Sequence, residues 1–317
     1  MKAVWTVGGI LGDKCDAIDF VADLGFDTMV TGSVSPDVMA RARKRQVRVV
    51  TNIFPFADDD FKRDSPHALQ KVRDYESQFA KAFEGQAWEH LTAGSYRWHP
   101  VLLARDGMCF EHEETKATIR ARIEKALSWA DGIALDGFGF MNYYACFCDR
   151  CEAIRAEMKA KEPDKPDLDI LVAMSAQTLV DIHEMIYDFA KSVDANKVVT
   201  DHVWPPFRPD EYIGHRFKLD YCTQTISWFY PPEWRLERVA FEAQEMKRLE
   251  DTSVNRFVPF IGIYDTGGHV RGAERLAKEL EIALTYGEGR VVVSRLTTLQ
   301  QHTHLANAVK KAFEQGQ

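Results

Sequence analysis

Short apolar runs rich in Val, Ile and Leu recur along the chain and alternate with longer runs that are apolar on one face only. The short runs predict eight strands, at residues 2–7, 27–31, 47–54, 132–136, 197–202, 221–228, 257–264 and 290–295. Most of these runs are nearly continuous in apolar residues, which is typical of strands buried on both faces of a parallel sheet.

Helical signals follow almost every predicted strand. Ser35, Pro36 and Asp37, for example, supply an N-cap, a proline for the first helical position and an acid for the first turn. Eight strand-then-helix units in 317 residues predict a single α/β domain, a (β/α)8 or TIM barrel over residues 1–317. A doubly wound open sheet is the alternative, although no Gly-x-Gly-x-x-Gly fingerprint follows the first strand.

Two connections between the predicted strands are unusually long. One is an excursion over residues 57–112 after the third strand, and the other covers residues 141–195 after the fourth and contains three of the six cysteines. Long loops at the carboxyl ends of barrel strands usually build the active site. We therefore expect both excursions to lie beside it.

The composition is that of an ordinary globular protein, with 45% hydrophobic and 28% charged residues. A net charge of −8 argues against nucleic-acid binding as a main activity, because phosphate binding normally needs a basic face. No run of about 18 apolar residues is present, so no membrane partner is expected, and the first residues read as a strand rather than a secretory signal. These features predict a cytoplasmic protein and leave open whether it forms a homo-oligomer.

The cysteines point to a metal site. Cys146, Cys148 and Cys151 form a Cys-x-Cys-x-x-Cys sequence, and three thiolates leave one tetrahedral position to be filled. Cys109, at the end of the first excursion, is the natural fourth ligand, and His112 is a weaker alternative. We expect a structural Zn²⁺ and no organic cofactor; a redox pair or simply buried thiols are the other interpretations.

This pattern of one cysteine, a helix, a strand and then Cys-x-Cys-x-x-Cys at a helix start resembles the zinc-cluster β-galactosidases of glycoside hydrolase family 42. Residues 130–136, ADGIALD, before the cluster are similar to a broad set of glycosidase-like (β/α)8 proteins. The resemblance covers residues 109–157 and implies that the four cysteines hold a structural zinc. The Asn-Glu pair that family 42 carries after strand 4 is missing, and strand 7 shows no obvious Glu nucleophile, so the catalytic pair of that family is not carried over.

Three acids end predicted strands and are the candidate catalytic residues. They are Asp136 on strand 4, Asp201 on strand 5 and Asp265 on strand 7. Glycoside hydrolysis needs two carboxylates flanking the scissile bond. The placement is similar to α-amylase-like barrels, which implies Asp136 as nucleophile or anchoring acid, Asp201 as acid/base and Asp265 as a sugar ligand. The alternative for each is an Asp that caps the helix or turn that follows it.

Other side chains near the predicted strand ends suit a sugar. Aromatic rings can stack on the flat C–H faces of a sugar ring, and amide, imidazole and guanidinium groups can bond its hydroxyls. The candidate substrate-binding residues are Asn52, His202, Trp204, Trp228, Tyr230, His269 and Arg295. The alternative for the aromatic residues is that they only pack long loops onto the barrel.

The sequence therefore predicts a glycoside hydrolase whose partner is a small glycoside or an oligosaccharide. One alternative is a metal-dependent lyase or isomerase on the same scaffold, with Asp136, Asp201 and His202 around a divalent ion. Another is a non-catalytic carbohydrate-binding barrel, because the glutamates that family 42 uses are absent.

Overall fold

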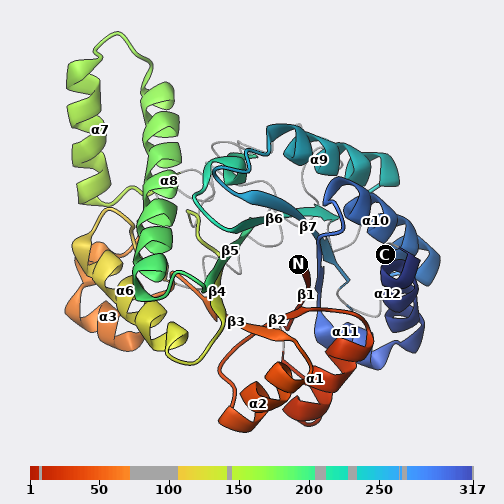
Figure 1. The fold of residues 1–317 in the computed structure, drawn as a ribbon. Coiled ribbons are helices and arrows are strands. Elements are labelled where there is room, and N and C mark those ends of the chain that lie inside the picture. Colours follow the sequence, from red (N-terminus) through yellow and green to blue (C-terminus); the bar gives the residue numbers. More distant parts are fainter. Residues whose placement is uncertain are drawn as a thin grey trace.

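The computed structural model describes residues 1–6, 9–71, 106–140, 145–203, 212–227, 234–263, 265 and 270–315. Eight parallel strands close into a barrel in the order β1 to β8 (Figure 1). They are β1 (Lys2–Trp5), β2 (Thr28–Thr31), β3 (Arg48–Ile53), β4 (Gly132–Asp136), β5 (Val198–Val203), β6 (Tyr221–Ser227), β7 (Arg256–Gly262) and β8 (Val291–Ser294). The predicted (β/α)8 barrel is confirmed, and each strand begins within one residue of its expected start.

Helices surround the barrel on its outer side (Figure 1). The α-helices are α1 (Lys14–Asp23), α2 (Pro36–Lys44), α3 (Asp59–Asp64), α6 (Glu113–Leu127), α7 (Asp149–Lys161), α8 (Asp167–Val193), α9 (Leu236–Leu249), α10 (Ala273–Tyr286), α11 (Leu296–Gln301) and α12 (Thr303–Gln315). Two short 3₁₀ turns are η1 (Pro66–Ala68) and η2 (Ile213–Arg216). None of the helices in the described part of the chain has the length and apolar character that crossing a membrane requires.

Local sequence signals explain where these helices begin. The Ser35 hydroxyl accepts a hydrogen bond from the backbone N–H of Val38, and Pro36 follows it at the first helical position of α2. The Asp13 carboxylate accepts from the backbone N–H groups of Cys15 and Asp16 and so caps α1 in the same way. Such caps satisfy donors that have no partner within the helix.

The two long connections differ in what they add to the barrel. After β3 the chain runs through α3 and η1. Two isolated antiparallel bridges, Phe56 to Gly107 and Leu69 to Met108, join this segment to the residues that precede α6. After β4 come α7 and the 27-residue α8. Figure 1 shows α7 beside α8, with both extending beyond the barrel. His183 in the later part of α8 contacts Asp201 on β5, which identifies α8 as the outer helix of the fourth unit and α7 as the addition.

Strand alternation decides which side chains face the barrel axis. The ring of Trp5 on β1 lies 5.4 Å from that of His202 on β5 and 5.8 Å from that of Phe260 on β7, so these three meet inside the barrel. The strand register then assigns further residues to the same interior face: Val50, Asn52, Ala134, Asp136, Thr200, Thr223, Thr225, Val258, Val292 and Ser294. The interior is therefore filled by side chains, many of them polar.

Gly132 allows a close approach between β4 and β5. A Cβ atom at this position would lie 2.4 Å from the backbone oxygen of Val198 and 2.9 Å from its backbone nitrogen. No side chain fits there unless the two strands separate, and separation would strain the ring of backbone hydrogen bonds.

Gly132→Ala should therefore lower the free energy of unfolding by about 1–3 kcal/mol, as overpacking of a tight interior does. Gly32→Ala is the matched control, because a Cβ at Gly32 would meet nothing within 4 Å. Urea denaturation of both variants measures the difference. Equal unfolding free energies for the two variants would contradict the close approach.

Candidate functional site

Three polar side chains from neighbouring strands meet at the carboxyl end of the barrel interior. Asp136 Oδ1 on β4 lies 3.4 Å from Nδ1 of His202 on β5. The other ring nitrogen of His202, Nε2, lies 2.9 Å from the Thr225 hydroxyl on β6. All three are buried. The contacts suit an imidazole that donates from Nδ1 to the carboxylate and accepts at Nε2 from the hydroxyl.

Two aromatic rings hold the imidazole of His202 in this orientation. Phe260 stacks on it with ring centroids 3.7 Å apart and planes 14° apart. Trp5 lies on β1 at a ring distance of 5.4 Å and a tilt of 55°. A ring packed in this way is pre-organised, because it does not have to give up alternative orientations when a ligand arrives.

Polar atoms without a protein partner also belong to the interior face. Within the described part of the chain, Asn52 Nδ2, Trp5 Nε1 and Thr200 Oγ1 are buried and have no hydrogen-bond partner. Buried polar groups normally do have one. Asn52, which the sequence predicts as a substrate ligand, thus directs a donor group into the same interior as Asp136.

Asp201 faces the other way. It precedes His202 on β5, and its carboxylate points outward to α8, where Oδ2 lies 3.0 Å from Nε2 of His183. The His183 ring donates from Nδ1 to the Leu179 carbonyl oxygen at 2.6 Å and stacks on Phe217 at 3.7 Å. Of the three acids predicted to be catalytic, Asp201 therefore does not share the barrel interior with Asp136. Alternation along β5 could have indicated this, since adjacent residues of a strand face opposite sides.

Burial raises the pKa of the Asp201 carboxyl, and the contact with His183 acts in the opposite direction. Because Nδ1 of His183 already carries the proton that it donates to Leu179, a neutral ring leaves Nε2 as an acceptor. A protonated Asp201 can donate to that nitrogen. The other carboxyl oxygen, Oδ1, has no partner within the described part of the chain, which also suits a neutral acid.

Two further predicted site residues, Asp265 and Arg295, follow β7 and β8. Asp265 is partly exposed, with Oδ2 3.3 Å from Nε2 of His302 between α11 and α12. Arg295 directly follows β8, and its Nε lies 3.4 Å from the Thr298 hydroxyl. Trp204, Trp228, Tyr230 and His269 lie outside the described residues.

A buried ionic network anchors the segments on both sides of β7. Glu279 on α10 accepts hydrogen bonds from the Ser227 hydroxyl at 2.8 Å, from Arg271 Nη1 at 2.6 Å and from Arg275 Nε at 2.8 Å. Arg275 also donates to the backbone oxygen of Trp234. Ser227 ends β6 and Arg271 precedes α10, so one carboxylate fixes chain segments at two strand ends. Loss of Glu279 would leave buried guanidinium charge uncompensated.

The four predicted cysteine ligands come together. Their sulfur atoms all lie within 4.8 Å of one another, and all four residues are buried. Cys109 Sγ lies 3.5 Å from those of Cys148 and Cys151, close to the roughly 3.8 Å edge of a tetrahedron with 2.3 Å metal–sulfur bonds. All four are free cysteines. This group could bind a metal ion.

The surroundings of this four-cysteine cluster stabilise its turn. Arg155 donates from Nη1 to the Cys146 carbonyl oxygen at 2.9 Å, and Cys146 Sγ accepts from the backbone N–H of Cys148 at 3.4 Å. Hydrogen bonds among the thiols raise the pKa of Cys109 and lower that of Cys148. His112, the alternative fourth ligand, lies outside the cluster with Nε2 3.6 Å from Cys148 Sγ.

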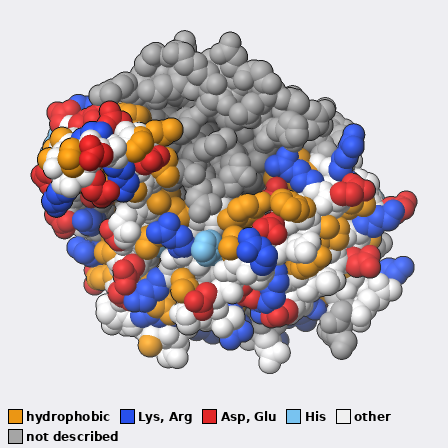
Figure 2. Space-filling model, turned by 90° about the horizontal axis from the view of Figure 1, so that it is seen from above, with side chains coloured by type: hydrophobic (Ala, Val, Ile, Leu, Met, Phe, Trp, Pro, Cys, Tyr) orange, Lys and Arg blue, Asp and Glu red, His pale blue; other side chains and the backbone are white. Residues whose placement is uncertain are grey.

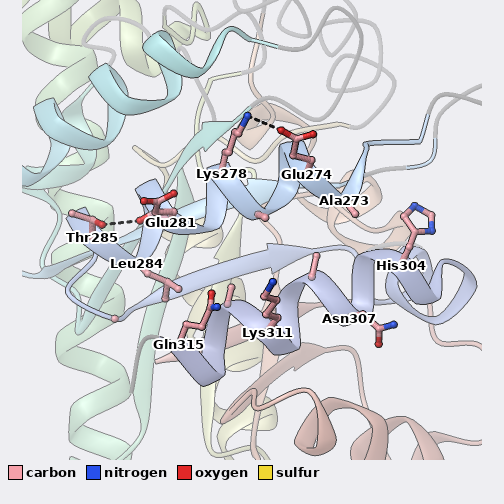
Figure 3. Close-up of a pocket in the computed structure, with 14 residues that line it drawn as sticks. Ala273, Glu274, Lys278, Glu281, Leu284, Thr285, His304, Asn307, Lys311 and Gln315 are labelled. Atoms are coloured by element: carbon pink, nitrogen blue, oxygen red, sulfur yellow. Dashed lines mark hydrogen bonds and ion pairs between the residues drawn. The ribbon is translucent and has the colours of Figure 1, made fainter.

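The surface is mixed in character. Acidic, basic and hydrophobic side chains of the described residues are interspersed on the face shown in Figure 2. A groove of about 880 Å³ lies on the outside, between α10 and α12 (Figure 3). Small side chains such as Ala277 and Ala308 line it, and Lys278 and Glu274 form an ion pair at its edge. This groove belongs to the helix layer and is separate from the interior that holds Asp136.

Comparison with known proteins gives a fold but no family. No family model and no curated protein sequence matches the chain. Among solved structures, the glycoside hydrolase domain of PgaB (BpsB) from Bordetella bronchiseptica is similar with a TM-score of 0.66 and 11% identity, over 98% of both chains. The β-galactosidase from the psychrophilic Marinomonas ef1 gives a TM-score of 0.69 and 10% identity, over 99% of this chain and 59% of that one.

A family 42 β-galactosidase also has a similar fold over most of this chain. A catalytic mutant of Gan42B, a family 42 β-galactosidase from G. stearothermophilus, matches with a TM-score of 0.60 and 10% identity, over 94% of this chain and 54% of that one. The chain thus spans little more than half the length of the β-galactosidases but nearly all of the PgaB domain. At these identities the shared property is the fold, a (β/α)8 barrel that these glycoside hydrolases also have.

The buried Asp201 predicts a dependence of stability on pH. Because burial raises its pKa, the folded protein keeps this proton to a higher pH than the unfolded chain does. The contribution of the protonated Asp201 carboxyl to folding stability is fully present below about pH 4. It is lost as the pH rises through the pKa of this carboxyl in the folded protein.

Asp201→Asn removes this titration while leaving an N–H group that can donate to His183. The stability advantage of the natural protein over the variant should therefore shrink between roughly pH 5 and roughly pH 8. Urea denaturation at both pH values measures it. An advantage that grows with pH would show that the folded state favours the ionised carboxylate.

Proposed function

We propose that the protein is a glycoside hydrolase and that Asp136 is its principal catalytic carboxylate. The contact of Asp136 with His202 inside the carboxyl end of the barrel carries this proposal. Active sites of TIM-barrel enzymes lie at this end of the barrel. The similarity of the fold to glycoside hydrolases supports the reaction class.

The neighbours of Asp136 suit it for attack on, or stabilisation of, an anomeric carbon. Nδ1 of the His202 imidazole lies 3.4 Å from Asp136 Oδ1 and so helps to orient the carboxylate. On the same interior face, the side-chain N–H groups of Asn52 and Trp5 have no partner among the described residues and can bond sugar hydroxyls. Water-excluding walls at Trp5 and Phe260 strengthen these interactions by lowering the local dielectric.

A second carboxylate is needed to protonate the leaving group or to activate water. Asp201 points toward α8, so in this proposal it is a positioning residue that holds β5 through His183. Asp265, partly exposed after β7 beside His302, is the acid that we propose for this second role and for contact with the sugar. Trp204, Trp228, Tyr230, His269 and Arg295 keep their proposed role as substrate contacts on the strength of their sequence positions alone.

The geometry disfavours the metal-dependent lyase or isomerase. Asp201 and His202 are adjacent on one strand and face opposite sides, so they cannot ligate the same ion together with Asp136. His202 also has its Nε2 next to the Thr225 hydroxyl at 2.9 Å. A non-catalytic carbohydrate-binding barrel would turn over no glycoside in the activity assay.

We also propose that the four-cysteine cluster holds a structural Zn²⁺. Four thiolates complete a tetrahedron, and a closed site of this kind stabilises structure and leaves no position for a reacting water. The ion would join the segment before α6, which carries Cys109, to the start of α7, which carries Cys148 and Cys151. It would thereby fasten the two long connections to each other.

Asp136→Asn should lower kcat/KM on chromogenic glycosides by about 10²–10⁴-fold, the usual contribution of a positioned catalytic carboxylate. The assay covers α- and β-linked substrates. Asp164→Asn is the control, because Asp164 is exposed in the turn between α7 and α8. Far-UV circular dichroism and urea denaturation check that both variants fold. The absence of turnover by the natural protein on any glycoside, or full activity of Asp136→Asn, would contradict the proposal.

Elemental analysis of protein passed through a weak chelator should find close to one tightly bound zinc per chain. Cys148→Ser should lose this zinc and unfold at a lower urea concentration, since the cluster would have three thiolates left. Cys15→Ser, which changes a half-buried cysteine outside the cluster, should keep both metal and stability. A Cys148→Ser variant that retains the metal would rule out the four-thiolate site.

A further inference from the structure

A second group of metal-binding side chains lies beside the four-cysteine cluster. One ligand atom from each of His67, His112 and Glu114 lies within 4.8 Å of the others. His67 Nε2 is 3.2 Å from Glu114 Oε1, and the two imidazole rings are 5.4 Å apart with planes at 71°. Neither the proposed reaction nor the four-cysteine cluster uses this group.

Backbone hydrogen bonds hold the three residues in place. His67 lies in η1, and the next residue, Ala68, accepts at its carbonyl oxygen from the backbone N–H of Cys109 at 2.8 Å. The bridge between Leu69 and Met108 adds a second link between the same two segments. His112 is the N-cap residue of α6, and Glu114 follows in the first turn. The ligand atoms are therefore brought together by the fold itself, before any ion binds.

The chemistry of the group differs from that of the four thiols. Two imidazoles and a carboxylate suit zinc and similar borderline divalent ions. The side chains of His67 and Glu114 are 59% and 46% exposed, so the site opens to solvent and has room for a water ligand. A simple surface ion pair would account for His67 and Glu114 alone and would not require the second imidazole.

His112 also connects this group to the buried cluster. Its Nε2 lies 3.6 Å from Cys148 Sγ, so this edge of the imidazole points toward the thiols. A ring nitrogen that donates to a thiolate is kept in a fixed orientation, and this leaves the other nitrogen available as a metal ligand. The two groups are thus adjacent and share one positioning contact, although their ligand sets are separate.

We propose that His67, His112 and Glu114 form a second metal site that binds Zn²⁺ with an open coordination position. This site is independent of the proposed hydrolase activity. Its occupant would join η1 to the start of α6. Because only three protein ligands hold the ion and solvent reaches it, binding is weaker than at the four-cysteine cluster.

Calorimetric titration of Zn²⁺ into protein that retains its tightly bound metal tests the proposal. The natural protein should take up one further equivalent. His67→Ala should weaken this uptake by more than the roughly 10–100-fold that loss of an outer partner costs, and Glu114→Gln should also weaken it. His304→Ala removes another exposed imidazole and serves as the matched control that titrates normally.

Co²⁺ distinguishes the two sites because a sulfur-free ligand set gives no thiolate charge-transfer absorption. The second equivalent of Co²⁺ should add d–d bands only, and these should be absent in His67→Ala. Uptake of no second equivalent by the natural protein, or the same uptake by His67→Ala as by His304→Ala, would overturn the proposal. Since glycosidase activity is not read out, a failure here is distinct from a failure of the proposed reaction.

Discussion

Closure of eight parallel strands into a barrel leaves each strand residue with two possible directions, toward the axis or toward the helices. The hydrogen-bonded register couples the choice on one strand to the choice on the next. Once Trp5, His202 and Phe260 meet on the axis, Asp136 must face inward with them and Asp201 must face outward. The candidate site and the buried pair of Asp201 and His183 are two results of this one constraint.

The barrel could be predicted from the sequence because its strands are buried on both faces and therefore appear as compact apolar runs. The cysteine set could also be predicted, since Cys146, Cys148 and Cys151 are close in the chain and a tetrahedral ion requires a fourth ligand. Both predictions rest on local patterns that allow few alternatives. The sequence carried no comparable local signal for contacts between layers.

Contacts between the strand and helix layers explain what the sequence did not reveal. His183 reaches Asp201 from a helix that precedes β5, and no spacing rule links a helix position to a particular strand residue. Thr225 contacts His202 through the stagger of β5 against β6, which depends on the register of the closed sheet. Apolar runs locate a strand well, but the assignment of each polar end residue to an inner or outer face also needs the alternation to be applied residue by residue.

The packing of His202 against Trp5 has a consequence for the order of folding. Trp5 lies on β1, which pairs with β8, while the imidazole that it contacts lies on the opposite side of the ring on β5. The environment of Asp136 is thus built from strands about 200 residues apart. The pairing of β1 with β8 must form before the interior can exclude water. Contacts between residues so far apart in the sequence form late. Closing the long loop between them costs conformational entropy, which only the finished contact offsets. A chain still emerging from the ribosome would have its acid at the end of β4 long before that acid has its binding surroundings.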